Sequence, residues 1–127
     1  VFDIYHYDEI IIENQIGQNA IRMKTLQGMI TMYFIEKNYK NIYFWNASQK
    51  LKNFSITHKT TYNERKKLSI EITKHIICEH YPDFETHYLS HKKKDDLADC
   101  FLQLLDFLKK RGVYPEYIFS IAINLKL

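Results

Sequence analysis

DEIIIEN, residues 8–14, is the stretch that decides the fold. Its centre, Ile10–Ile12, consists wholly of β-branched residues, which is typical of a short strand buried on both faces of a parallel sheet. A second run of branched and aromatic residues, Ile42–Trp45, also favours a strand. We therefore expect two short strands separated by about thirty residues.

A helix is predicted between these strands. Asn19 is suited to cap its start, and the helix should run from Ala20 to about Lys37. Its apolar residues recur at helical spacing: Met23, Leu26, Ile30, Tyr33 and Phe34. Strand, helix and strand in this order form a βαβ unit, which nearly always has a right-handed crossover.

A long second helix should follow a polar, basic connection, Ser48–Lys59. Either Thr60 or Thr61 would cap this helix, which reaches about Tyr81, and Pro82 stands just past its end, where a proline belongs. One face carries apolar residues, namely Leu68, Ile72 and Ile76.

A last helix should run from near Lys93 to Gly112, because glycine suits the position after a helix. Its apolar stripe is predicted to contain Leu97, Phe101, Leu104, Leu105 and Leu108. The apolar tail, Val113–Leu127, fits either a strand or a helix. With no repeat or linker, residues 1–127 are expected to form a single α/β domain.

Composition narrows the class of protein. Of 127 residues, 46% are apolar, and only three glycines and two prolines occur, which argues against disorder. No apolar run approaches the ~20 residues that span a bilayer, and no signal peptide is visible. We expect an intracellular protein without a membrane partner, and two reduced thiols, Cys78 and Cys100, in the core.

Basic residues are concentrated between residues 50 and 67, although the net charge is only +3. They are Lys50, Lys52, Lys59, Arg65, Lys66 and Lys67, opposed only by Glu64. This stretch is either a patch that binds phosphates or a solvated loop. Cations in the first turn of a helix oppose its dipole, and a locally unfavourable placement often marks function.

Three acids lie at the start of the last helix, in KKDDLADC, residues 93–100. Asp96 and Asp99 share a helical face, and so do Asp95 and Asp99. Such acids either hold a cation between them or serve as ordinary favourable charges at a helix N-terminus. Glu13 ends the first strand, where ligands gather in open α/β sheets, although a solvated glutamate is the alternative.

Three segments resemble, in order, motifs of the RuvC-type Holliday-junction resolvases. They are IIIENQ with RMKTLQGMITMYF (residues 10–15 and 22–34), YNERKKLSIEIT (62–73) and KKDDLADCFLQLLDFL (93–108). Order and spacing are most similar to the resolvases of poxviruses and other large cytoplasmic DNA viruses, and the resemblance covers about Asp8 to Leu108. It implies an RNase H-like mixed sheet flanked by helices.

The resemblance also implies an activity: hydrolysis of phosphodiester bonds at four-way DNA junctions during viral recombination, replication and concatemer resolution. Mg²⁺, or Mn²⁺ in its place, would be held by Glu13, Asp96 and Asp99, with Asp95 as a helper outside the ligand set. Lys67 would offset charge on the scissile phosphate, and Lys66 is the alternative for this role.

The implied partners are branched DNA and a second copy of the chain, in a viral factory of the host cytoplasm. The residues expected to contact the DNA backbone are Lys50, Lys52, Lys59, Arg65 and Lys66. The helix Ala20–Lys37 is the expected dimer contact.

One departure from the family concerns its first catalytic acid, which lies on a strand well before the glutamate. Here only twelve residues precede Glu13. Residues 1–4, VFDI, are similar to that motif, but Tyr5–Tyr7 replace its glycine turn. We expect the N-terminal strands to be missing from this chain. This leaves open an inactive RNase H-like DNA-binding or scaffolding protein, or another RNase H-like nuclease such as a mitochondrial-type resolvase.

Overall fold

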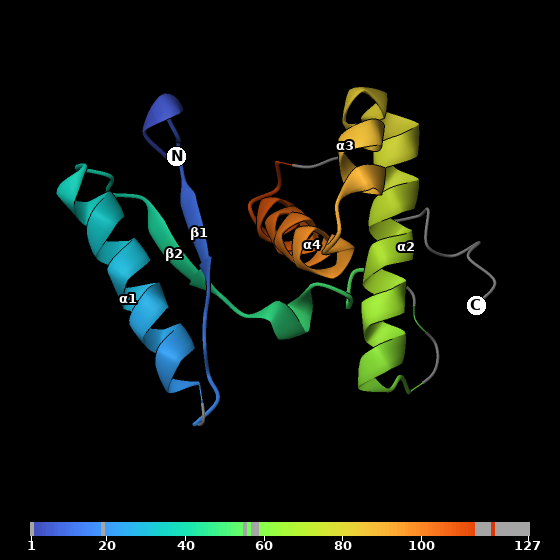
Figure 1. The fold of residues 1–127 in the computed structure, drawn as a ribbon, viewed down its shortest axis with the longest axis horizontal. Coiled ribbons are helices and arrows are strands. Elements are labelled where there is room, and N and C mark those ends of the chain that lie inside the picture. The colour runs from blue at the N-terminus through green and yellow to red at the C-terminus, as the bar shows by residue number, and fades with distance from the viewer. Residues whose placement is uncertain (1, 19, 55, 57–58, 114–117, 119–127) are drawn as a thin grey trace. The chain divides into compact units, whose positions relative to one another are not determined.

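The computed structural model describes residues 2–18, 20–54, 56, 59–113 and 118 (Figure 1). The chain divides into two compact units, Val1–Ala47 and Ser48–Leu127. The described residues form four α-helices and a two-stranded parallel sheet, as expected of an α/β protein. The further strands of an RNase H-like sheet stay a prediction.

The first unit is the predicted βαβ arrangement. Strand β1 (Ile10–Glu13) pairs in parallel with β2 (Ile42–Trp45), and helix α1 (Ile21–Glu36) connects them (Figure 1). Backbone hydrogen bonds extend the pairing by one residue before β2, from Ile10 N to Asn41 O, and by one residue after β1, from Asn14 N to Trp45 O, each 2.8 Å long. The prediction of two neighbouring parallel strands is confirmed. The expected burial of Ile10–Ile12 on both faces is wrong, because only Ile10 is buried in the two described strands.

Helix α1 buries little of its own surface. Phe34 is its one buried side chain among the described residues, and its ring meets those of Tyr7 and Tyr39 edge-on. Met23 and Leu26, predicted to face inward, are about half exposed. Two strands about 5 Å apart offer a helix only a narrow surface. The residue at the N-cap is Ala20, whereas Asn19 lies outside the described residues.

The second unit consists of α2 (Tyr62–His80), a short α3 (Glu85–Ser90) and α4 (Lys94–Lys110), with single 3-10 turns at Ala47–Gln49 and Pro82–Phe84. Thr61 caps α2. Its hydroxyl accepts from Glu64 N at 3.3 Å, and the Glu64 carboxylate accepts from Thr61 N at 2.6 Å. Such a capping box contributes about 1 kcal/mol, and it decides between the two predicted caps.

The core of the second unit lies between α2 and α4. Ile72 and Ile76 of α2 meet Leu102 and Leu105 of α4, and Ile118 joins them. Two further members of this core, Leu51 and Phe54, come from the connection Ser48–Lys59. This connection is therefore anchored at its apolar residues, although its composition is mostly polar.

The predicted apolar stripe of α4 is confirmed as one apolar face, which lines a cavity, but it is not the most buried face of the helix. Of its five residues only Leu105 is buried, and the buried apolar face contains Ala98, Leu102 and Phe107 instead. Because α4 has apolar residues on two faces, periodicity alone does not show which face meets α2. The prediction that α4 ends at Gly112 is confirmed by its left-handed φ of 67°.

The prediction that both thiols lie in the core is wrong for Cys100. Cys78 is half-buried, but Cys100 is exposed, because it lies about half a turn away from the buried Ala98 and Leu102. The strand-or-helix question for the tail falls outside the described residues, apart from Val113 and Ile118. Among the helices that the structure describes, none is both long and apolar enough to cross a membrane.

Candidate metal and nucleic-acid site

Two carboxylates at the start of α4 are each bound by a lysine from an earlier segment. Lys66 Nζ, in the first turns of α2, lies 2.7 Å from Asp95 Oδ2. Lys50 Nζ, on the connection before α2, lies 2.5 Å from Asp99 Oδ1. Asp95 and Asp99 are four residues apart, so both carboxylates project from one face of the helix.

Asp96 occupies a different position. Its carboxylate is 66% exposed, and its cationic neighbour is Lys93 of the same segment, at 3.6 Å. Asp95, expected to be only a helper, is therefore more enclosed than Asp96. The two candidate lysines also differ in their surroundings. Lys66 contacts Asp95, whereas Lys67 is exposed. The geometry favours Lys66 over Lys67 as the lysine of this site.

The Lys66–Asp95 pair changes the acidity of both groups. The hydrogen bond from Lys66 lowers the pKa of Asp95 below its usual 3.8. In return, the hydrogen bond to Asp95 raises the pKa of Lys66, and so does Tyr62, whose ring centroid lies 5.4 Å from Nζ. Both groups are therefore charged throughout the neutral range.

We predict that Lys66→Met raises the pKa of Asp95 toward its usual value, because the donor that stabilises the carboxylate is lost. Since the folded-state pKa is depressed, the pair stabilises the fold above pH 3.8, and its contribution is lost as pH falls through the folded-state pKa. A carboxyl-carbon NMR titration measures the shift. Lys67→Met is the matched control, and an unchanged Asp95 pKa in Lys66→Met contradicts the pairing.

The connection Ser48–Lys59 lies along α4. Lys50 pairs with Asp99, and three residues later Asn53 Nδ2 donates to Asp106 Oδ1 at 2.7 Å, two turns further along the helix. Asp106 is 2% exposed and also accepts from Lys110 Nζ at 3.1 Å. The sequence analysis missed Asp106. Its signal was a lone acid within the apolar run LQLLDFL, residues 102–108.

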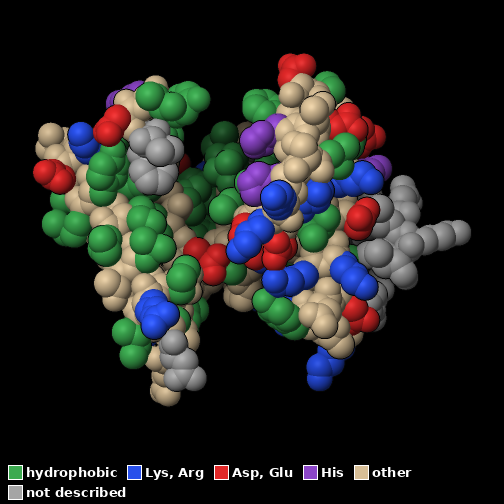
Figure 2. Space-filling view, viewed as in Figure 1, with side chains coloured by type: hydrophobic (Ala, Val, Ile, Leu, Met, Phe, Trp, Pro, Cys, Tyr) green, Lys and Arg blue, Asp and Glu red, His purple; other side chains and the backbone are tan. Residues whose placement is uncertain are grey.

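The remaining predicted DNA contacts lie on the surface of the second unit. Lys52 and Lys59 are exposed, and Arg65 is exposed while donating from Nη1 to Thr60 O at 2.8 Å. Figure 2 shows basic and acidic side chains intermixed on this unit rather than separated into patches of one sign. The basic stretch is thus partly neutralised by the acids of α4.

Glu13 belongs to the first unit and the aspartates to the second, so their convergence stays a prediction. Glu13 ends β1 as expected, and its Oε1 accepts from Gln15 Nε2 at 3.3 Å. Within the described parts of the chain, no three His, Cys, Asp or Glu side chains gather as a metal-binding group. The expected ligand set for Mg²⁺, Glu13 with Asp96 and Asp99, therefore stays a prediction.

Asp3 is not part of a strand. It lies in a 3-10 turn, Phe2–Ile4, where its carboxylate accepts from the Tyr33 hydroxyl at 2.6 Å and pairs with Lys37 at 3.2 Å. The Tyr33 hydrogen bond lowers the pKa of Asp3 and raises that of Tyr33 to about 12. Asp3 therefore does not take the strand position of the first catalytic acid.

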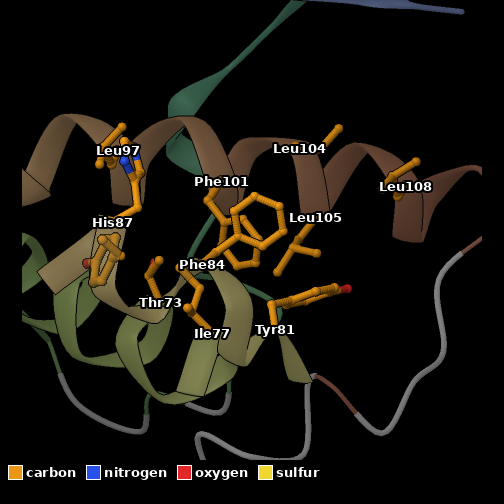
Figure 3. Close-up of a pocket in the computed structure, with 11 residues that line it drawn as sticks. Thr73, Ile77, Tyr81, Phe84, His87, Leu97, Phe101, Leu104, Leu105 and Leu108 are labelled. Atoms are coloured by element: carbon orange, nitrogen blue, oxygen red, sulfur yellow. The ribbon is translucent and has the colours of Figure 1, made fainter. Parts of the chain in front are cut away.

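The second unit also contains an apolar cavity. It lies among α2, α3 and α4 and has a volume of about 400 Å³. The rings of Tyr81, Phe84 and Phe101 lie close together in this cavity (Figure 3). All five residues of the predicted α4 stripe line it, namely Leu97, Phe101, Leu104, Leu105 and Leu108. Such a lining offers nothing to a phosphate, so the acidic start of α4 is the candidate site.

The sequence has no significant match to a protein-family model, a curated protein or a solved structure.

Proposed function

We propose that this chain is the core of a metal-dependent endonuclease that cuts four-way DNA junctions, like the viral resolvases whose motifs it resembles. One observation carries the proposal: Lys66 of the basic segment contacts Asp95 of the acidic segment, 29 residues later. In the proposed mechanism, carboxylates hold divalent cations and a nearby ammonium group offsets charge on the phosphate. The Lys66–Asp95 contact supports this proposal because it brings a lysine and a carboxylate of the two motifs together.

The acids have divided roles in the proposed site. Asp99, with Asp96 and Glu13, would hold Mg²⁺ or Mn²⁺, which would activate water and stabilise the leaving oxygen. Asp95 holds the Lys66 ammonium at the acidic cluster and so restricts where it can lie. The Lys66–Asp95 contact supports the role of Asp95, whereas the ligand roles of Asp99, Asp96 and Glu13 rest on the resemblance.

The proposed DNA contact is electrostatic. Lys52, Lys59 and Arg65 are exposed and lie within the sixteen residues from Lys50 to Arg65. They would follow the phosphate backbone. Each phosphate that they neutralise releases counterions, so the logarithm of the affinity should fall with the logarithm of the salt concentration, with a slope of about −0.9 per contact.

A second candidate function is an inactive DNA-binding protein of the same fold. It is favoured by the ion pairs of Asp95 and Asp99, since each carboxylate is balanced by a lysine. Another RNase H-like nuclease is the third candidate, and the choice of substrate separates it from a resolvase.

The test uses the natural full-length protein with a labelled four-way junction and a linear duplex of the same arms. We expect paired cuts in opposite strands of the junction with Mg²⁺ or Mn²⁺, and none with EDTA. Cutting of the duplex at the same rate favours the third candidate. Tight junction binding without cutting favours the inactive protein. The absence of both binding and cutting overturns the proposal.

A further inference from the structure

Helix α1 exposes an apolar stripe that its own unit leaves uncovered. The stripe consists of Ile21, Thr25, Gly28, Met32 and Ile35. These residues follow one another in alternating steps of four and three, which is the spacing of the contact residues in paired helices. Ile21, Met32 and Ile35 are 72%, 61% and 48% exposed, while the buried Phe34 lies on the other side of the helix. Figure 2 shows hydrophobic side chains at the surface of this unit.

Gly28 lies at the centre of the stripe. A Cβ added there would meet no atom within 4 Å, so nothing in the chain itself requires glycine at this position. In a helix interior, glycine costs close to 1 kcal/mol relative to alanine. A glycine at the middle of an apolar stripe allows another helix to approach the backbone closely.

The charges beside the stripe select a partner and an orientation. Arg22, Met29 and Glu36 are spaced by seven residues along one flank, with the cation at the start of α1 and the anion at its end. If a second α1 lies antiparallel across a two-fold axis at residues 28–29, Arg22 of each copy faces Glu36 of the other. In a parallel pair this flank would face the opposite flank of the partner helix, so Arg22 and Glu36 would not face each other.

We infer that α1 pairs antiparallel with α1 of a second copy of this chain. The two Gly28 residues meet at the crossing, and Ile21 of one copy packs beside Ile35 of the other. The pairing closes with two-fold symmetry, the commonest arrangement of homodimers. This pairing deepens the proposed function, because it gives the proposed resolvase dimer a specific surface. The pairing rests on α1 alone and is measured without DNA. Its failure and the failure of the nuclease proposal are therefore distinguishable.

Sedimentation equilibrium of the full chain tests the pairing. We expect a reversible dimer, and Gly28→Glu should weaken it by at least about tenfold, because two carboxylates would oppose each other at the crossing. The substitution has room within the monomer, and circular dichroism checks that the helices remain. Gly17→Glu, in the loop before α1, is the matched control, with the same change of charge and no expected effect on the dimer.

A charge exchange tests the orientation. Arg22→Glu and Glu36→Arg should each weaken the dimer by roughly two- to fivefold, since exposed ion pairs contribute little. The double variant Arg22→Glu/Glu36→Arg should regain the wild-type dissociation constant. A wild-type chain that stays monomeric overturns the inference, and so does a double variant weaker than both single ones. A monomer that instead sediments with anionic vesicles would assign the stripe to a membrane and would overturn it as well.

Discussion

Replacing Asp99 by asparagine is expected to reduce junction cutting by about 100-fold or more, because the proposed mechanism needs its negative charge opposite a divalent cation. The fold should survive. The Lys50–Asp99 pair is part exposed, with 34% of the aspartate side chain accessible, and such pairs contribute about 1 kcal/mol or less. Single-turnover cutting of a four-way junction at saturating Mg²⁺ measures the first effect, and urea denaturation measures the second.

Asp83→Asn is the matched control for Asp99→Asn, since Asp83 is exposed and lies on the 3-10 turn Pro82–Phe84. The control should cut like the wild type. If Asp99→Asn loses cutting only in proportion to the fraction of unfolded protein, Asp99 is a structural anchor for Lys50 and not a catalytic group. The same comparison for Asp96→Asn shows whether the more exposed acid is needed as well.

Replacing Asp106 by alanine should lower the free energy of unfolding by about 3 kcal/mol. The carboxylate is 2% exposed and accepts from both Asn53 and Lys110, so its removal leaves the half-buried Asn53 amide without this acceptor. Asp106→Asn keeps the shape and one acceptor oxygen, and should cost only about 1 kcal/mol. Urea denaturation followed by circular dichroism measures both changes.

Asp83→Ala serves as the control for Asp106→Ala, with an expected change within about 0.5 kcal/mol. If Asp106→Ala is equally harmless, the link between the connection Ser48–Lys59 and α4 does not stabilise the second unit. A loss confined to Asp106→Ala, and absent in Asp106→Asn, identifies the hydrogen bond to Asn53 as the main contribution.

The sequence by itself determined the elements whose causes lie within a few neighbouring residues. The branched run Ile10–Ile12 makes β1, and Gly112 ends α4. The start of α2 was predicted at Thr60 or Thr61, and the structure selects Thr61. The shared face of Asp95 and Asp99 was also predictable, because it follows from helical periodicity alone. These features need no information from distant parts of the chain.

Only the tertiary structure decided what depends on segments far apart in the sequence. Both faces of α4 are apolar, and packing against α2 selected Ala98 and Leu102 over Leu104. The partners of Asp95 and Asp106 come from 29 and 53 residues away, so no local pattern could reveal them. Lys50 and Lys66 could be recognised as basic from the sequence, but their pairing with the acids of α4 follows from how the second unit packs.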